Sequence, residues 1–452
     1  MRGLGMSTLA AVTAAIDPDQ ELWQWLDRPL QIAKILGWCA LIFTVFYAIV
    51  MAAMALTGLL LARRTRGPIE TELQAAHHAP QPMRGQTYRT QAETSLARWY
   101  ALALLAGLLF FYLALPFVLF GLLVVVLITM VTLGGRGYRD DLGSHLLRAG
   151  GGGMSAVMKA LFARSGTAGL GVRKQRTQCP KLFAAIDEVA ARVETEPPDE
   201  VWIAPGAEFS VCQRGRGPFG VFGGSRRVLT LGLCVLHFLT ESEFKSILAH
   251  EFAHFSHADT YWHRFIYQVT LSLRTALGEM ARTGGWVTWI NPFYWFFWLY
   301  SRSYSLLAAG FSRSREFLAD RMACSHYGSD VFATALEKVC IDGGQFEKVI
   351  YKNIAGLLAK NQAFVNMYLA FRKFHEERGV ERQQRLAVLL EETPSLFDSH
   401  PTYTQRLTAA QLLPRAAQQD RNSALQLFDN SEQVEQELTD YLTHALASRL
   451  RL

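Results

Sequence analysis

A histidine, a glutamate and a second histidine stand at the spacing His250-Glu251-x-x-His254 near the middle of the chain. On a helix, residues four apart lie on one face, so the two imidazole rings can bind one metal ion together. The glutamate after the first histidine can reach a water on that metal and act as general base. The spacing therefore predicts a catalytic zinc site with Glu251 as the base, against the alternative of a helix with two partly buried histidines.

The surrounding residues predict a helix for reasons that do not depend on the motif. Thr240 and Glu243 have the spacing of a capping box, in which each side chain bonds the backbone N–H of the other residue at the start of a helix. Apolar residues then recur at helical spacing, at Phe244, Ile247, Leu248 and Phe252. We therefore expect the motif to lie on a helix that begins just after Thr240.

A second acidic pair can complete the metal site. Glu316 and Asp320 are four residues apart and would share a helix face. Glu316 would complete a His₂Glu ligand set with the fourth position left to water, which is the arrangement of catalytic zinc. Asp320 could accept the free ring N–H of a ligand histidine. The alternative is a solvated charged helix face, with neighbouring arginines as partners: Arg313, Arg315 and Arg321.

The combination of these segments resembles the membrane zinc metallopeptidases typified by the HtpX heat-shock protease and the CAAX prenyl protease. The segments are His250-Glu251-x-x-His254, Asp259 and Ser314-Arg315-Glu316-x-x-Ala319-Asp320. The likeness covers roughly residues 180–410 and implies a zincin-like gluzincin catalytic domain with one zinc ion (Zn²⁺) per chain. It implies that this ion is bound by His250, His254 and Glu316, and that Asp320 and Asp259 lie behind the ligands.

The resemblance extends to Ser399-His400-Pro401 and to Arg406, which lies six residues after the histidine. In the family, a histidine and an arginine at this spacing line the active site and stabilise the oxyanion of the tetrahedral intermediate. The resemblance therefore gives these roles to His400 and Arg406. The family's Asn-Ala-Phe segment, which contacts the substrate backbone, has its nearest match in Ala207-Glu208-Phe209, which lacks the asparagine.

The composition is that of a membrane protein with a substantial soluble part. Half of the 452 residues are hydrophobic and only 19% are charged. The net charge of +6 comes without a basic motif interleaved with aromatic residues, so nucleic acid is not an expected partner. The six cysteines are scattered without a Cys-x-x-Cys pair, which argues against a disulfide framework and fits a reducing compartment.

Two uncharged stretches predict membrane-spanning segments. After an N-terminal segment (1–34), residues 35–62 are long enough to cross a bilayer as one transmembrane helix, and a basic loop (63–98) follows. Residues 99–135 are longer than one span, so they form either a hairpin of two short spans or one long kinked helix. A basic, Gly-rich linker (136–178) comes next.

Charge predicts how these segments are oriented, because basic residues mark the cytoplasmic flanks of membrane spans. Both flanks of residues 99–135 are basic, and this requires an even number of crossings between them. The prediction is therefore three spans with the N-terminus outside. It makes the chain an integral membrane protein of a bacterial inner membrane, with its catalytic domain on the cytoplasmic side.

The rest of the chain is expected to form a zinc metallopeptidase domain (179–414) and a C-terminal helix (415–452). A helix over Leu182–Val193 and two strands, Val201–Val211 and Arg227–Leu233, are predicted before the motif helix. The second strand either offers its edge to an extended substrate or is an ordinary core strand. The fold class is thus mostly α with a small β-sheet (α+β), preceded by transmembrane helices.

An aromatic segment (286–311) separates the motif helix from the second acidic pair. Such a cluster of Trp, Tyr and Phe is typical of the membrane interface. Arg302 interrupts the segment, so an interfacial or re-entrant helix is favoured over a further full span.

The expected function is that of a membrane-bound zinc metalloendopeptidase that hydrolyses protein substrates in membrane-protein quality control. The substrate is expected to bind as an extended strand, and the lipid bilayer is the other partner. Two alternatives stay open: a CAAX-type prenyl-protein protease, and a non-proteolytic membrane scaffold or chaperone-like protein with a remnant zinc site. The intact Glu251 disfavours the scaffold, because a structural zinc site has no need of a base.

Overall fold

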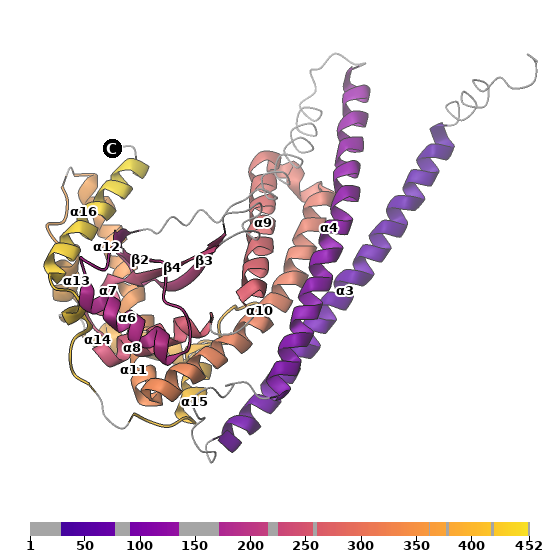
Figure 1. The fold of residues 1–452 in the computed structure, drawn as a ribbon. Coiled ribbons are helices and arrows are strands. Elements are labelled where there is room, and N and C mark those ends of the chain that lie inside the picture. Colours follow the sequence, from indigo (N-terminus) through magenta and orange to yellow (C-terminus); the bar gives the residue numbers. More distant parts are fainter. Residues whose placement is uncertain are drawn as a thin grey trace, which may run out of the picture. The chain divides into compact units, whose positions relative to one another are not determined.

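Two long apolar helices precede the catalytic region, α3 (Pro29–Ala76) and α4 (Gln91–Gly134) (Figure 1). Within them, Leu41–Arg63 and Ser95–Val118 are each long and apolar enough to cross a membrane. The computed structural model describes residues 29–76, 91–134, 171–215, 225–255, 260–360, 362–376, 379–416 and 420–450. The chain divides into two compact units, Met1–Met54 and Ala55–Leu452, and the catalytic region lies within the second.

The hairpin expected over residues 99–135 is wrong, because α4 is one continuous helix through this stretch up to Gly134. A hairpin needs a turn, and turns are built from clusters of Gly, Pro, Asn, Asp and Ser. The neighbours of Pro116 are instead Leu, Phe and Val, and these keep the helix although proline removes one backbone hydrogen bond. The three-span topology that rested on this hairpin loses its basis.

The catalytic region contains a four-stranded sheet in the order β1-β2-β4-β3. Its strands are β1 (Val172–Lys174), β2 (Glu200–Ala204), β3 (Phe209–Gly215) and β4 (Ser225–Gly232). β2 and β4 are parallel, whereas β1 is antiparallel to β2 and β3 is antiparallel to β4. The expected α+β class with a small sheet is confirmed, although β1 lies in the segment that was expected to be a linker.

Two expectations about the strands are wrong. The stretch Val201–Val211 is not one strand, because β2 ends at Ala204 and β3 begins only at Phe209, with Pro205-Gly206 between them. β4, which was expected to offer its edge, is paired with β2 on one side and β3 on the other. Its apolar side chains are buried, as is typical of a central strand: Val228, Leu229 and Leu231.

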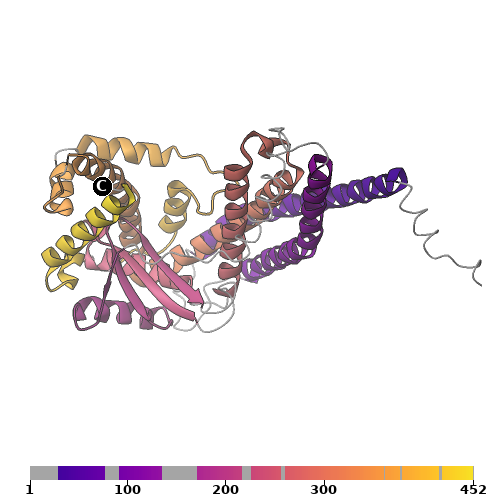
Figure 2. The same ribbon diagram turned by 90° about the horizontal axis from the view of Figure 1, so that it is seen from above.

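Helices cover the sheet and lead into the motif. The predicted helix over Leu182–Val193 is confirmed as α6 (Pro180–Arg192), which runs along one flank of the sheet in Figure 2. Its buried face consists of Leu182, Phe183, Ala185, Ile186, Val189 and Ala190. The short helix α7 (Leu233–Leu236) then connects β4 to α8 (Glu241–Ala253), which carries the motif.

A helical hairpin follows the motif helix. It consists of α9 (Thr260–Gly284), the 3-10 helix η2 (Gly285–Ile290) and α10 (Pro292–Tyr327). Asn291 caps α10, because its side chain accepts a hydrogen bond from the backbone N–H of Phe293. Proline at the first helical position completes this start, since its missing N–H would have had no helical partner there.

The first half of α10 packs antiparallel along α4. The Tyr300 hydroxyl donates a hydrogen bond of 2.9 Å to the Gly107 carbonyl, and the Tyr300 ring lies 5.0 Å from that of Phe111. Further along α10, Gly310 permits a close approach, since a Cβ there would lie 2.5 Å from the Tyr100 hydroxyl. The aromatic segment therefore comprises most of η2 and the first half of α10, which lies against a candidate membrane span.

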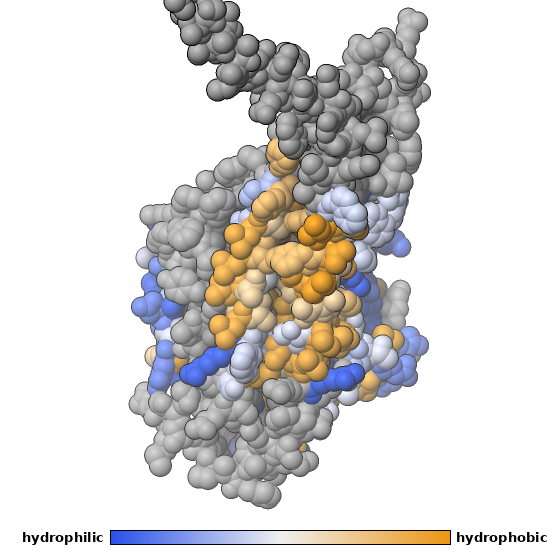
Figure 3. Space-filling view, turned by 90° about the vertical axis from the view of Figure 1, so that its right-hand side faces the viewer, coloured by the Kyte–Doolittle hydropathy of each residue, from blue (hydrophilic) through white to orange (hydrophobic). Residues whose placement is uncertain are grey.

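The outer side of α4 is apolar. Five large side chains along it are more than half exposed: Leu102, Leu109, Leu113, Phe117 and Phe120. Figure 3 shows an apolar surface on this side of the molecule, bordered by hydrophilic residues. An extended apolar surface with a polar border is typical of a site that contacts a membrane or another protein.

The C-terminal part is helical, as expected from its pattern. Its elements are α11 (Ser329–Lys338), the π-helix η3 (Val339–Gly343), α12 (Gly344–Leu358), α13 (Met367–Glu376), α14 (Gly379–Leu390), α15 (Tyr403–Gln411), the 3-10 helix η4 (Ala424–Leu427) and α16 (Ser431–Leu450). α16 contacts both β1 and α13, and Lys174 forms an ion pair with Glu437. The C-terminal helix is thus part of the catalytic domain's packing.

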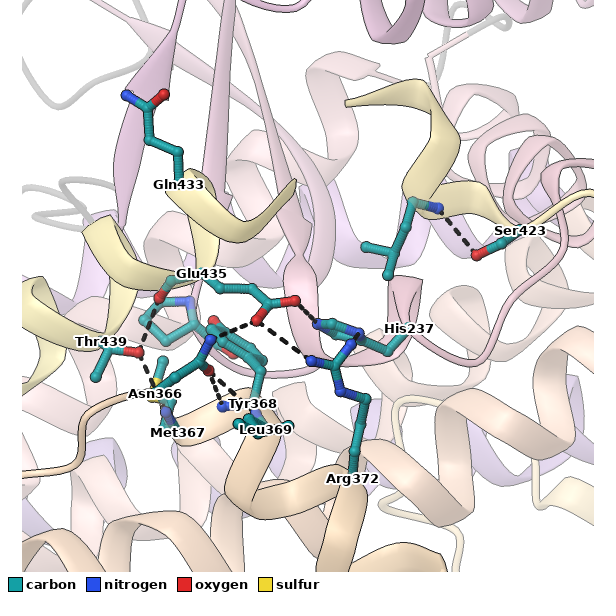
Figure 4. Close-up of polar contacts among 12 residues, drawn as sticks. His237, Asn366, Met367, Tyr368, Leu369, Arg372, Ser423, Gln433, Glu435 and Thr439 are labelled. Carbon is teal, nitrogen blue, oxygen red and sulfur yellow. Dashed lines mark hydrogen bonds and ion pairs between the residues drawn. The ribbon is translucent and has the colours of Figure 1, made fainter. Parts of the chain in front are cut away.

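A buried polar network fastens α16 to this domain (Figure 4). Glu435 is only 1% exposed and accepts a hydrogen bond of 2.6 Å from the Asn366 side chain. Its carboxylate lies 3.3 Å from Nε2 of His237 and 3.6 Å from a guanidinium nitrogen of Arg372. The network therefore joins α16 to α13 and to the residue that ends α7.

Replacing Glu435 with alanine is expected to lower the free energy of unfolding by about 3 kcal/mol, because it leaves buried polar partners unpaired. Denaturant unfolding of the detergent-solubilised chain measures this change. Glu432→Ala, on the exposed face of the same helix, is the matched control and should change stability by less than about 0.5 kcal/mol. An equal loss in the two variants would contradict the structural role of Glu435.

Candidate metal centre

The motif helix α8 presents its histidines near its C-terminal end. The predicted capping box at its start is confirmed: the Thr240 hydroxyl accepts from the Glu243 backbone N–H, and the Glu243 carboxylate accepts from the Thr240 backbone N–H. Apolar residues of α8 are buried in the core and set the rotation of the helix: Phe244, Leu248 and Phe252. His250 is then buried, and His254 forms the C-cap.

Helix α10 brings Glu316 to the two histidines. Nε2 of His250 lies 3.6 Å from one carboxylate oxygen of Glu316, and Nε2 of His254 lies 3.5 Å from the other. One ligand atom from each of the three residues lies within 4.8 Å of the others. In the part of the chain that the structure covers, no other three His, Cys, Asp or Glu residues bring their ligand atoms this close together.

The three residues fit a zinc ion by their chemistry and by their orientation. Two imidazole nitrogens and one carboxylate are the ligand set of many catalytic zinc sites, which keep a position open for water. Nδ1 of His250 lies 2.8 Å from Asp320 Oδ1, so the ring can donate its proton there and leave Nε2 free to bind metal. His250, His254 and Glu316 are thus the residues that would hold the ion.

Asp320 and Arg406 form a second layer behind the ligands. The guanidinium of Arg406 donates two hydrogen bonds to the Asp320 carboxylate, of 2.9 Å from Nε and 2.6 Å from a terminal nitrogen. The remaining terminal nitrogen lies 3.8 Å from Glu316. The structure therefore brings both predicted residues to the site, with Arg406 bonded to Asp320.

His400 reaches the site from the segment that precedes α15. Its Nδ1 lies 3.2 Å from the carboxylate of Glu316, while 66% of its side chain is exposed. The hydrogen bond to Glu316 raises the pKa of His400, and this favours the ring form in which both nitrogens donate. His400 is the site residue that faces solvent most openly, whereas Glu316 and Asp320 are buried.

The pKa values of the two glutamates in the site are shifted in opposite directions. Burial raises the pKa of Glu251 to about 7, although the charge of His250 acts against this. Burial also disfavours the charged form of Glu316, but the hydrogen bond from His400 and the charges of His250, His254 and Arg406 lower its pKa below the usual range. Glu316 is thus held as a carboxylate, and Glu251 is the more basic group.

Two arginines of α10 have structural roles that the sequence did not indicate. Arg315 is buried and donates a hydrogen bond of 2.7 Å to the carbonyl of His254, so it links the end of α8 to α10. Arg313 donates to two carbonyls of the segment that carries His400. From the sequence, both were weighed only as partners of a solvated charged face.

Asp259 lies outside the residues that the structure describes, so its predicted place behind the ligands stays a prediction.

Two histidines one helical turn apart, a glutamate after the first, and a third ligand from a glutamate on another helix define a zinc metallopeptidase of the gluzincin type. Residues 219–413 match the model of peptidase family M48, which covers the motif helix, Glu316 and the segment with His400. The chain thus carries an M48 zinc metallopeptidase region. No curated protein and no solved structure gives a significant match to the chain.

Proposed function

We propose that this M48 zinc metallopeptidase is a membrane-bound endopeptidase that cleaves unfolded or damaged membrane proteins. The observation that carries the proposal is the convergence of His250, His254 and Glu316 beside Glu251, with Glu316 on a helix that packs against a candidate membrane span. A purely structural metal site would have no use for a glutamate that follows the first ligand and can act as a base.

In this proposal, Glu251 acts as the general base. It accepts a proton from the attacking water and later delivers that proton to the leaving amine. When bound, a zinc ion in this ligand set polarises the scissile carbonyl and makes its water more acidic. Asp320, held by Arg406, keeps the proton of His250 on Nδ1.

His400 is proposed to stabilise the oxyanion of the tetrahedral intermediate. Its ring is exposed to the space that a substrate would enter, and Nδ1 is bonded to Glu316. The raised pKa of His400 supports a protonated ring, whose Nε2–H can donate to the developing negative charge. Arg406 supports this role through its bonds to Asp320 and its charge beside Glu316.

The substrate is proposed to bind as an extended strand along β3 rather than β4. Within the described residues, β3 pairs with β4 only, so its other edge is the one that can receive a further strand. β3 lies next to the motif helix, since the ring of Phe209 is 6.3 Å from that of Phe244. A strand added there would run beside the metal site.

The membrane location and its side are also proposals. Tyr100, at the beginning of the candidate span Ser95–Val118, contacts α10 at Gly310, only six residues before Glu316. The metal site is thus close to the end of α4 that follows the basic loop 63–98. Because basic loops stay in the cytoplasm, this position supports an active site on the cytoplasmic side of an inner membrane.

Metal removal tests the proposal directly. The detergent-solubilised chain is incubated with an unfolded membrane protein and, separately, with a farnesylated peptide. Cleavage of the unfolded protein is expected to stop when a zinc chelator is added and to return with added zinc, because the ligand set cannot act without its metal. Cleavage that persists in the chelator would contradict the zinc mechanism. Cleavage of the farnesylated peptide alone would favour a prenyl-protein protease.

A further inference from the structure

The segment that carries His400 has no hydrophobic anchor of its own. Residues 391–402 connect α14 to α15, and none of the side chains of residues 391–400 is buried, whereas Pro401 and Thr402 are. Its internal bonds shape a local turn: the backbone N–H of Ser395 donates to Asp398, and that of Phe397 donates to the Ser395 hydroxyl. These bonds give the segment a shape but do not attach it to the rest of the domain.

Arg313 supplies that attachment. One terminal nitrogen of its guanidinium donates to the carbonyl of Leu396 at 3.1 Å and to the carbonyl of Asp398 at 2.6 Å. Both bonds have a charged donor, and both hold backbone rather than side chain. Arg313 therefore bonds the backbone of the turn before His400 directly to α10.

A second arginine of α10 acts on the same turn. The guanidinium carbon of Arg302 lies 3.9 Å from the centre of the Phe397 ring, in a cation–π contact. Arg302, Arg313 and Glu316 are separated by eleven and three residues, so they lie on the same side of the helix. The helix that carries the third metal ligand thus also holds the segment that brings His400 to that ligand.

We propose that Arg313 is a positioning residue that holds the Leu396–Asp398 turn on α10 and thereby fixes His400 beside Glu316. The inference rests on the proposed role of His400 in catalysis. The other end of the segment is already fixed, because Thr402 and Gln405 form a capping box at the start of α15. With Arg313 removed, the turn would lose both of its backbone hydrogen bonds to α10 and keep only the contact of the Phe397 ring with Arg302.

The attachment itself is tested without any activity measurement. Arg313→Met keeps the aliphatic stem and removes the donors, whereas Arg313→Lys keeps one charged donor on a shorter side chain. Hydrogen exchange of the full-length chain in detergent is measured over residues 395–402. We expect exchange about tenfold faster in Arg313→Met, a smaller increase in Arg313→Lys, and near wild-type exchange in the exposed control Arg415→Met. Unchanged exchange in Arg313→Met overturns the proposal.

The link to His400 is tested by a double-mutant cycle. Arg313→Met is expected to lower kcat about tenfold with KM changed less than twofold and with full zinc content, since a misplaced catalytic group affects the transition state. In a His400→Ala background the same substitution should lower kcat less than twofold further. A full tenfold loss in that background would show that Arg313 acts independently of His400 and would overturn the inference.

The two tests also separate this inference from the proposed function. Faster exchange in Arg313→Met together with a wild-type chain that lacks zinc-dependent peptidase activity would leave the attachment intact and reject the proposed function. A fully active wild-type chain with unchanged exchange in the variant would reject the attachment and leave the proposed function intact.

Discussion

The Glu251→Gln variant is expected to lose about 10²- to 10⁴-fold in kcat/KM while it keeps its zinc. Glutamine has nearly the same size as glutamate but cannot accept the proton of the attacking water. The ligands His250, His254 and Glu316 are untouched, so metal binding should persist. Zinc content by metal analysis and peptide cleavage by the same preparation measure the two effects separately.

The matched control is Glu241→Gln, on the first turn of the same helix α8. This change removes a carboxylate at the far end of the helix from the metal ligands, and activity within about twofold of wild type is expected. If Glu251→Gln cleaved protein substrate at the wild-type rate, the assignment of the base would be wrong. Loss of zinc together with activity would mean that Glu251 supports the metal rather than the proton transfer.

Removal of one ligand is expected to have the second large effect. The His254→Ala chain should retain no stoichiometric zinc after dialysis and no measurable peptidase activity, because two remaining protein ligands do not complete a catalytic zinc site. The structure supports this expectation by placing Nε2 of His254 within 3.5 Å of the Glu316 carboxylate. Metal analysis of the dialysed protein gives the result directly.

His444→Ala provides the control for general effects of losing a histidine, because His444 is exposed on α16. Zinc content and activity should stay at the wild-type level in that variant. A His254→Ala chain that still bound one zinc per molecule would remove His254 from the ligand set. Asp320→Asn is expected to have a smaller effect than loss of a ligand, because all three ligands remain. The zinc affinity should fall about 10- to 100-fold, since Asp320 supports the ligand His250.

The metal ligands could be predicted from the sequence because each depends on local geometry. The capping box at Thr240 and Glu243 defines where α8 begins, and helical periodicity then places His250 and His254 on one face. Glu316 and Asp320 have the same spacing on a second helix. This spacing predicted Glu316 as the third ligand and Asp320 as the residue that accepts a ring N–H of a ligand histidine. His400 and Arg406 came instead from the resemblance to a family.

The features that were missed depend on contacts between distant segments. β4 was expected to have a free edge, but it pairs with β2 as well as with β3. No local pattern near residues 227–233 indicates β2 as a partner. Arg313 and Arg315 look like surface residues in a charged stretch, yet they bond carbonyls of Leu396 and His254. The hairpin over 99–135 came from the charge of the flanks, whereas helix propensity and the lack of turn residues favoured one helix.

The unbroken course of α10 sets how far the metal site lies from the contact with Tyr100. Six residues of helix separate Gly310, in contact with Tyr100, from Glu316, and this corresponds to about 9 Å along the axis. With α4 in the bilayer as proposed, Tyr100 lies five residues inside the candidate span that begins at Ser95, so this distance would bring Glu316 close to the membrane surface. We therefore expect a substrate to reach the metal site through a segment that is unfolded next to the membrane surface.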